Sequence, residues 1–152
     1  VHVGKANGRQ KYKDVTLDNS YPWQRQHWRT LETAYRTSPF FEFYEDDIKP
    51  LYTEPFESLL DFNFKTIKTI FECLQLEMPQ TKTEKFEEKP VDYIDLRSLI
   101  SAKLKPQLDI EPYVQVFGDR NGFIPNLSIL DLLFNVGPNT IDYLKTRIHY
   151  TN

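Results

Sequence analysis

The chain has 152 residues, of which 39% are hydrophobic and 27% charged, and its formal net charge is −3. This length is typical of a single domain, which would span residues 1–152 and is large enough to bury a core without a structural metal. The single cysteine excludes an intrachain disulfide. No window approaches the roughly 20 apolar residues of a membrane span, and no secretory signal opens the chain. We therefore expect a cytoplasmic protein with no membrane span.

Charge is distributed unevenly along the sequence. Residues 1–37 carry a net charge of +4, residues 38–95 carry −8, and the remainder carries +1. No two basic residues are adjacent, and neither a zinc-finger spacing nor a glycine-rich phosphate loop is present. The basic first third suits an anionic ligand or a solvated face, and nucleic acid is not an expected partner.

The first twenty residues predict extended and turn structure. Val1-His2-Val3 alternates as a half-buried strand does, Asn7-Gly8 marks a turn, and residues 15–17 form a short extended run. Because the chain begins within this strand pattern and without a methionine, we expect an N-terminally incomplete domain.

Three helices are predicted in the first half of the chain. Polar residues before Pro22 mark the start of a helix over residues 22–35. Aromatic and aliphatic residues at steps of three and four predict a short helix over 40–50, whose aromatics are expected in the core, with stacking on a sugar or base as the alternative. A 3.6-residue apolar period predicts a longer helix over 55–76.

The second half of the chain opens with a polar segment, residues 77–90, which we expect to be a mobile excursion. The elements predicted after it are an extended segment over 93–96, a helical turn near Leu99, a strand over 113–117, and helices over 129–135 and 138–148. These patterns together predict an α+β fold that is predominantly helical with a few short strands.

The densest set of polar residues lies around the first predicted helix. His27 is the candidate general acid or base, or else a core histidine, and Glu32 is a second candidate base. Arg25 and Arg29 lie about one turn apart and either bind an anion together or form a solvated face. The set also contains Asp18, Asn19, Gln24 and Tyr35.

Asp18 and Asn19 precede a helix start, so they either cap the helix or border a seat for an oxyanion or phosphate. Asp131 lies in an apolar run, where a carboxylate must face solvent or find a partner such as an arginine. The histidines lack metal-ligand spacing, so we expect no metal and no cofactor.

Two blocks of sequence resemble the WbqC-like protein family. The first spans residues 18–44 and includes Pro-Trp-Gln-Arg-Gln-His-Trp-Arg at 22–29. The second is Phe-Ile-Pro-Asn-Leu-Ser-Ile-Leu-Asp-Leu-Leu-Phe-Asn at 123–135, followed by a Gly-Pro pair. The family is bacterial and occurs in some O-antigen gene clusters, and a glycine transferase role has been suggested for a member. Members begin with a further N-terminal block, and relatives often carry an acidic residue where this chain has Val136.

The resemblance implies a setting in the assembly of surface polysaccharides. Our hypothesis is a transferase that attaches an aminoacyl group to a sugar amine of a small-molecule or sugar-linked substrate, with His27 or Glu32 as the base. The residues expected to bind substrate are Asp18, Asn19, Gln24, Arg25, Arg29, Tyr35, Asn126 and Asp131. The alternative is a non-catalytic module that docks a partner protein. A hollow shared by His27, Arg29 and the 123–135 block would favour the transferase.

Overall fold

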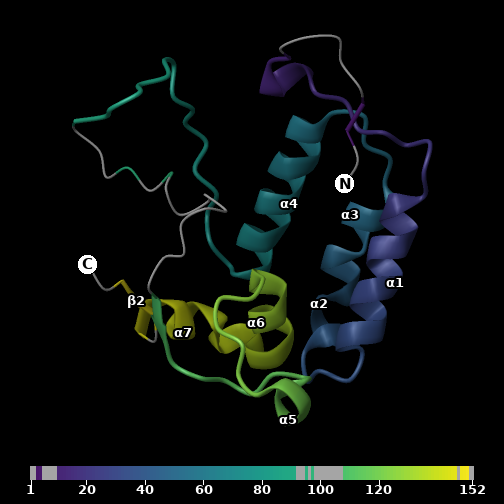
Figure 1. Cartoon of the computed structure of the whole chain (residues 1–152), viewed down its shortest axis with the longest axis vertical. Coiled ribbons are helices and arrows are strands. Elements are labelled where there is room, and N and C mark those ends of the chain that lie inside the picture. Colours follow the sequence, from purple (N-terminus) through teal and green to yellow (C-terminus); the bar gives the residue numbers. More distant parts are fainter. Residues whose placement is uncertain are drawn as a thin grey trace.

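The structure is a computed structural model that describes residues 3–4, 10–91, 95, 97, 108–146 and 148–150. Helices predominate, and Figure 1 shows α1 to α4 on one side of α6 and α7. In chain order the elements are η1 (Tyr12–Asp14), α1 (Trp23–Tyr35), α2 (Phe41–Ile48), α3 (Pro50–Thr53), α4 (Leu59–Cys73), β1 (Leu108–Ile110), α5 (Gly118–Asn121), α6 (Ile129–Val136), η3 (Gly137–Asn139), α7 (Thr140–Thr146) and β2 (Ile148–Tyr150).

The first helix, α1, follows Pro22 as the sequence predicts. Trp23 and Trp28 are its buried residues, and they turn one side of the helix toward the interior. Beyond its end, the Arg36 guanidinium binds the carboxylates of Glu32 at 2.9 Å and Glu45 at 3.1 Å. This ion-pair network lies on the outer side of α1 and ties it to α2, with a modest effect on stability because it is partly exposed.

The predicted helix over 40–50 is present as α2, and Pro50 starts the separate short helix α3. A proline suits the first turn of a helix because it has no N–H to leave unbonded. Phe41, Tyr44 and Ile48 are buried at helical spacing, whereas Phe43 is 64% exposed. The aromatic run is therefore mostly core, as predicted.

The helix predicted over 55–76 begins four residues later than expected and ends at Cys73. The Ser58 hydroxyl accepts the N–H of Asp61 at 3.2 Å and so caps the helix. The preceding backbone pairs with the extended run 15–17: Leu17 donates to the Glu57 carbonyl at 2.7 Å, and Leu59 donates to the Val15 carbonyl at 3.0 Å. These long-range bonds hold residues 57–59 against the run and set the start of α4.

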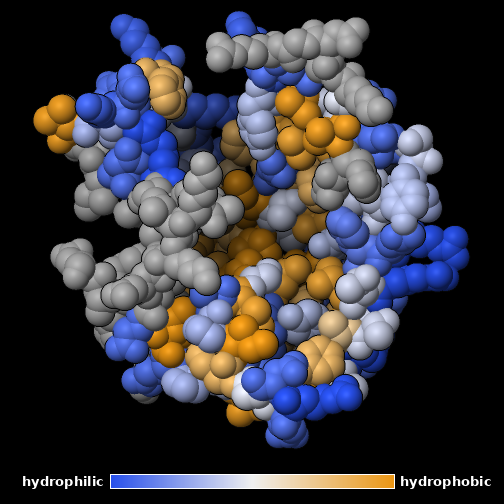
Figure 2. All heavy atoms as spheres, in the orientation of Figure 1, coloured by the Kyte–Doolittle hydropathy of each residue, from blue (hydrophilic) through white to orange (hydrophobic). Residues whose placement is uncertain are grey.

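The core forms where α6 packs on α2. The rings of Phe134 and Phe41 lie 5.1 Å apart, and the Phe40 N–H donates to the Phe134 carbonyl at 3.0 Å. Apolar side chains gather toward the middle of the face in Figure 2, over α4 and α6. The buried members of the cluster are Trp28, Phe41, Tyr44, Ile48, Leu133 and Phe134.

In the C-terminal third the predicted strand is absent, whereas the final predicted helix is present with shorter bounds. Residues 113–117 form no strand, because their backbone pairs with no strand in the described part of the chain; the side chain of Gln115 instead bonds the backbone N–H and carbonyl of Ile124, each at 2.9 Å, and a turn leads into α5. The helix predicted over 138–148 ends at Thr146, and β2 then pairs antiparallel with β1. The α+β class with few short strands is confirmed.

The chain from 77 to 90 contains neither helix nor strand, and its predicted mobility stays a prediction. Val3 forms an antiparallel bridge with Leu17, whereas residues 1–2, most of 93–96 and Leu99 lie outside the described residues. In the described ranges no helix has the length and apolarity to cross a membrane.

Gly137 is required at the end of α6 for two reasons. Its φ is +63°, a left-handed conformation that favours glycine, and an added Cβ would lie 2.5 Å from atoms of the Phe40 ring. We expect Gly137→Ala to lower the free energy of unfolding by about 2–4 kcal/mol. Gly118→Ala is the matched control, because nothing lies within 4 Å of a Cβ there. Equal urea denaturation midpoints for the two variants would refute this requirement.

Candidate functional site

Half of the predicted site residues line two hollows at opposite ends of α1, and the other half line neither. Asn19, Gln24 and Arg25 lie at its N-terminal end, and Tyr35 lies with Asp131 at its C-terminal end. The helical rise of 1.5 Å per residue separates Trp23 from Tyr35 by about 18 Å along the axis. The single hollow expected from the sequence is therefore replaced by two.

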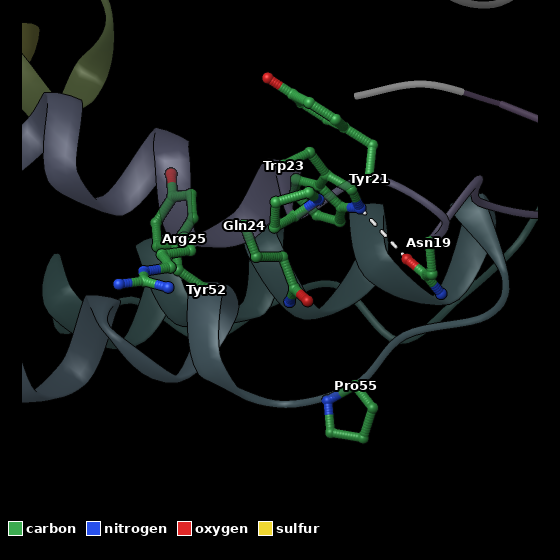
Figure 3. A pocket seen from close by; sticks show the side chains of 8 residues that line it. Asn19, Tyr21, Trp23, Gln24, Arg25, Tyr52 and Pro55 are labelled. Carbon is green, nitrogen blue, oxygen red and sulfur yellow. Dashed lines mark hydrogen bonds between the residues drawn. The ribbon is translucent and has the colours of Figure 1, made fainter.

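The first hollow, which we call the α1 hollow, has a volume of about 330 Å³. Figure 3 shows Asn19 and Arg25 on opposite sides of it, with Gln24 between them. Its lining consists of polar and aromatic side chains from the start of α1 and from the α3 region: Asn19, Tyr21, Pro22, Trp23, Gln24, Arg25, Tyr52 and Pro55.

Asn19 and Gln24 build the walls of the α1 hollow. The Asn19 amide donates to the Phe56 carbonyl at 2.7 Å and accepts the Trp23 indole N–H at 3.1 Å. The Gln24 amide donates to the carbonyls of Leu51 at 3.2 Å and Glu54 at 2.7 Å. Both side chains thus fix the start of α1 against α3 and the segment that follows it.

Arg25 differs from these two residues. Its side chain is exposed at the hollow and makes no hydrogen bond or ion pair with the described part of the chain. No side chain in the described part of the chain caps α1, and Asp18 instead accepts the backbone N–H of Ser20 at 3.0 Å and its hydroxyl at 2.5 Å. The hollow therefore offers an uncommitted guanidinium beside a helix N-terminus.

The other predicted residues of α1 lie outside both hollows. His27 is exposed, with its ring edge-on to the Trp23 indole at 5.5 Å between centroids, so it is not a core histidine. Arg29 is exposed one turn after Arg25. Glu32 is committed to the ion pair with Arg36.

The second hollow surrounds a buried carboxylate. Asp131 is 3% exposed, and its Oδ2 accepts the Tyr113 hydroxyl at 2.5 Å and the Gln115 amide at 3.3 Å. The partner is not the arginine considered from the sequence: among the described residues, Asp131 forms no ion pair. We call this hollow, of about 70 Å³, the Asp131 pocket.

The phenols beside Asp131 remain protonated at neutral pH. Burial, the Asp131 charge and a hydrogen bond to that carboxylate raise the pKa of Tyr35 to about 12. Burial and a hydrogen bond to Asp131 also raise the pKa of Tyr113. The Tyr113 ring is held edge-on by Phe123 at 5.5 Å and Tyr143 at 5.3 Å. Both tyrosines are thus hydrogen-bond donors in fixed positions.

Asn126 does not line the Asp131 pocket. It is exposed in a tight turn with a φ of +56°. Asparagine tolerates this left-handed conformation better than most residues, which accounts for its presence in the turn.

Sequence reasoning missed Tyr113 and Gln115, which lie two residues apart. In an extended segment, residues i and i+2 point to the same side of the backbone. The two-residue spacing of Tyr113 and Gln115 could therefore have indicated that both side chains point the same way, although the segment is not a strand. In the described ranges, no group of three or more His, Cys, Asp or Glu residues could hold a metal ion.

Comparison with known proteins decides the family. The model of the WbqC-like protein family matches residues 1–105 and 93–143. The chain belongs to the WbqC-like protein family. A relative, the uncharacterized protein Rv1507c of Mycobacterium tuberculosis, is 28% identical over 170 residues, which covers 93% of this chain and 72% of the relative. No solved structure matches. Both hollows draw residues from the stretch that the family model covers.

The raised pKa of Tyr35 predicts a loss of stability at high pH. An unfolded tyrosine ionises near pH 10, whereas Tyr35 in the folded chain stays protonated to about pH 12. Its contribution is complete below pH 10 and is lost as the pH rises toward 12. We expect the difference in unfolding free energy between the wild type and Tyr35→Phe to be constant from pH 7 to about 9 and to shrink above about 10. If urea titrations gave a difference in unfolding free energy that did not change with pH up to about 11, the loss of stability predicted for Tyr35 would be excluded.

Proposed function

We propose that this protein binds an anionic, sugar-linked small molecule in the α1 hollow and transfers an aminoacyl group to a sugar amine in the assembly of surface polysaccharides. The observation that carries the proposal is the uncommitted Arg25 guanidinium in a concave hollow at the start of a helix. Membership of the WbqC-like family supports the setting. A cytoplasmic location belongs to the same proposal.

Electrostatics favour an anion in the α1 hollow. The first-turn N–H groups of α1 have no side-chain cap, and the helix dipole places partial positive charge there. The Arg25 guanidinium adds a full charge and a planar set of donors that match a phosphate or carboxylate. The first 37 residues also carry a net charge of +4.

The aromatic lining suits a sugar ring. Tyr21 and Tyr52 border the hollow together with the Trp23 indole. Flat rings pack against the apolar face of a sugar, while amide groups such as that of Gln24 bond its hydroxyls. The volume of about 330 Å³ lies at the lower end of the range usual for small-molecule sites. Its concave shape favours a small ligand over docking of a partner protein.

The proposed reaction joins the amine to an activated aminoacyl donor with a phosphate-bearing leaving group. The amine nitrogen bonds to the carbonyl carbon, the bond to the leaving group breaks with its electron pair, and the amine loses one proton to a base. We assign the base to His27, which lies outside the lining of the α1 hollow but whose ring contacts Trp23 in the hollow wall. Glu32 is the weaker candidate, since Arg36 holds its carboxylate. Arg25 would bind the leaving group.

Removal of the Arg25 charge tests the binding step. We expect Arg25→Ala to weaken binding of glucose 1-phosphate by about tenfold to a hundredfold, because a charge-assisted hydrogen bond is lost. Isothermal titration calorimetry would measure the dissociation constant.

Arg120→Ala is the matched control for Arg25→Ala. It removes an equally charged side chain from α5, outside the α1 hollow, and should leave the dissociation constant unchanged. Equal affinity of all three proteins for glucose 1-phosphate, or no binding to any of them, would contradict the proposed site.

A further inference from the structure

The Asp131 pocket contains a buried carboxylate that lacks a cationic partner among the described residues. Asp131 is 3% exposed, and every ion pair among the described residues involves other carboxylates. Burial of an ionised carboxylate is unfavourable unless charge or hydrogen bonds compensate for the lost water. The question is therefore what compensates for the Asp131 charge.

The groups that bond Asp131 are neutral donors. The Tyr113 hydroxyl and the Gln115 amide both donate to Oδ2, and the Tyr35 hydroxyl is a third neutral donor beside the carboxylate. A carboxylate has about four acceptor positions, so at least one remains open. Gln115 is itself held by two bonds to Ile124 and cannot move to fill it. The arrangement solvates the negative charge without neutralising it.

The cavity beside Asp131 is small, and its outer part is apolar. Its volume of about 70 Å³ provides space for about five heavy atoms, since one water needs about 10–15 Å³ on this measure. Phe117, Ile124 and Leu127 line it and are each more than 40% exposed. A ligand that fits this site has a positive end toward Asp131 and a hydrocarbon part toward the mouth.

This division of polar and apolar groups favours an ammonium ion over a metal ion. Calcium and magnesium require six or more oxygen ligands, and the pocket provides one carboxylate flanked by hydroxyl and amide donors. We propose that the Asp131 pocket binds a primary ammonium group carried on a short hydrocarbon stem. The inference is independent of the proposed function, because the pocket and the α1 hollow lie at opposite ends of α1.

The probe for this site is n-butylammonium chloride, which has five heavy atoms besides the counterion. Two-dimensional amide NMR of the full chain would follow the titration at constant ionic strength. We expect saturable shifts at Gln115, Ile124 and Asp131, and a rise in melting temperature with probe concentration. 1-Butanol has the same stem without the charge and should bind at least tenfold more weakly.

Three variants locate the binding. Asp131→Asn keeps the shape of the side chain and removes its charge, and it should weaken butylammonium binding at least tenfold. Leu127→Trp narrows the mouth from an exposed position with Asp131 intact, so it remains informative if Asp131→Asn does not fold. Asp46→Asn is the matched control, because it removes an exposed carboxylate on α2 and should bind as the wild type does.

Three results would overturn the proposal. The first is equal affinity of the protein for 1-butanol and butylammonium. The second is an affinity for butylammonium that is unchanged in Leu127→Trp and also in Asp131→Asn, if that variant folds. The third is an equal loss of affinity in Asp46→Asn, which would mean that the probe binds acidic surfaces in general. Because glucose 1-phosphate is not used, failure here leaves the test of the α1 hollow unaffected.

Discussion

The bonds to the Asp131 carboxylate hold together parts of the chain that regular secondary structure does not connect. They join the segment before α5, through Tyr113 and Gln115, to α6, and Tyr35 at the end of α1 lines the same pocket. Between β1 and α6 only the short helix α5 is regular, so this segment depends on side chains for its conformation. Since a buried carboxylate is costly without its donors, the network favours one arrangement of these three parts.

The helix α1 places two different electrostatic environments at its ends. Its N-terminal end carries an uncapped helix dipole and the Arg25 guanidinium, and its C-terminal end lies against Asp131. Trp28 fixes the helix in the core between them. A ligand with an anionic part and another with a cationic part would therefore find separate sites, about 18 Å apart along the helix axis.

The sequence predicts the helices well where one face is apolar at helical spacing, as in α1, α2 and α6. It fails where a distant contact decides the local structure. The start of α4 is set by pairing of residues 57–59 with 15–17, and Gln115 replaces a predicted strand by bonding Ile124. Of the polar residues grouped around the first predicted helix, Asn19, Gln24 and Arg25 line the α1 hollow, and their role in binding substrate stays a prediction. The hydrophobic periodicity of the sequence describes local structure only. It cannot show that Tyr113 and Gln115, which lie 18 and 16 positions before Asp131, bond its carboxylate.

A double-mutant cycle on Tyr113 and Asp131 tests the central interaction most directly. The single variants Tyr113→Phe and Asp131→Leu each leave a buried polar group without its partner, whereas the double variant removes both groups. We expect the double variant to be more stable than the sum of the single effects by about 1–3 kcal/mol in urea denaturation at pH 7. Additive effects within about 0.5 kcal/mol would show that the hydroxyl and the carboxylate do not stabilise one another, and would contradict the role given to Asp131.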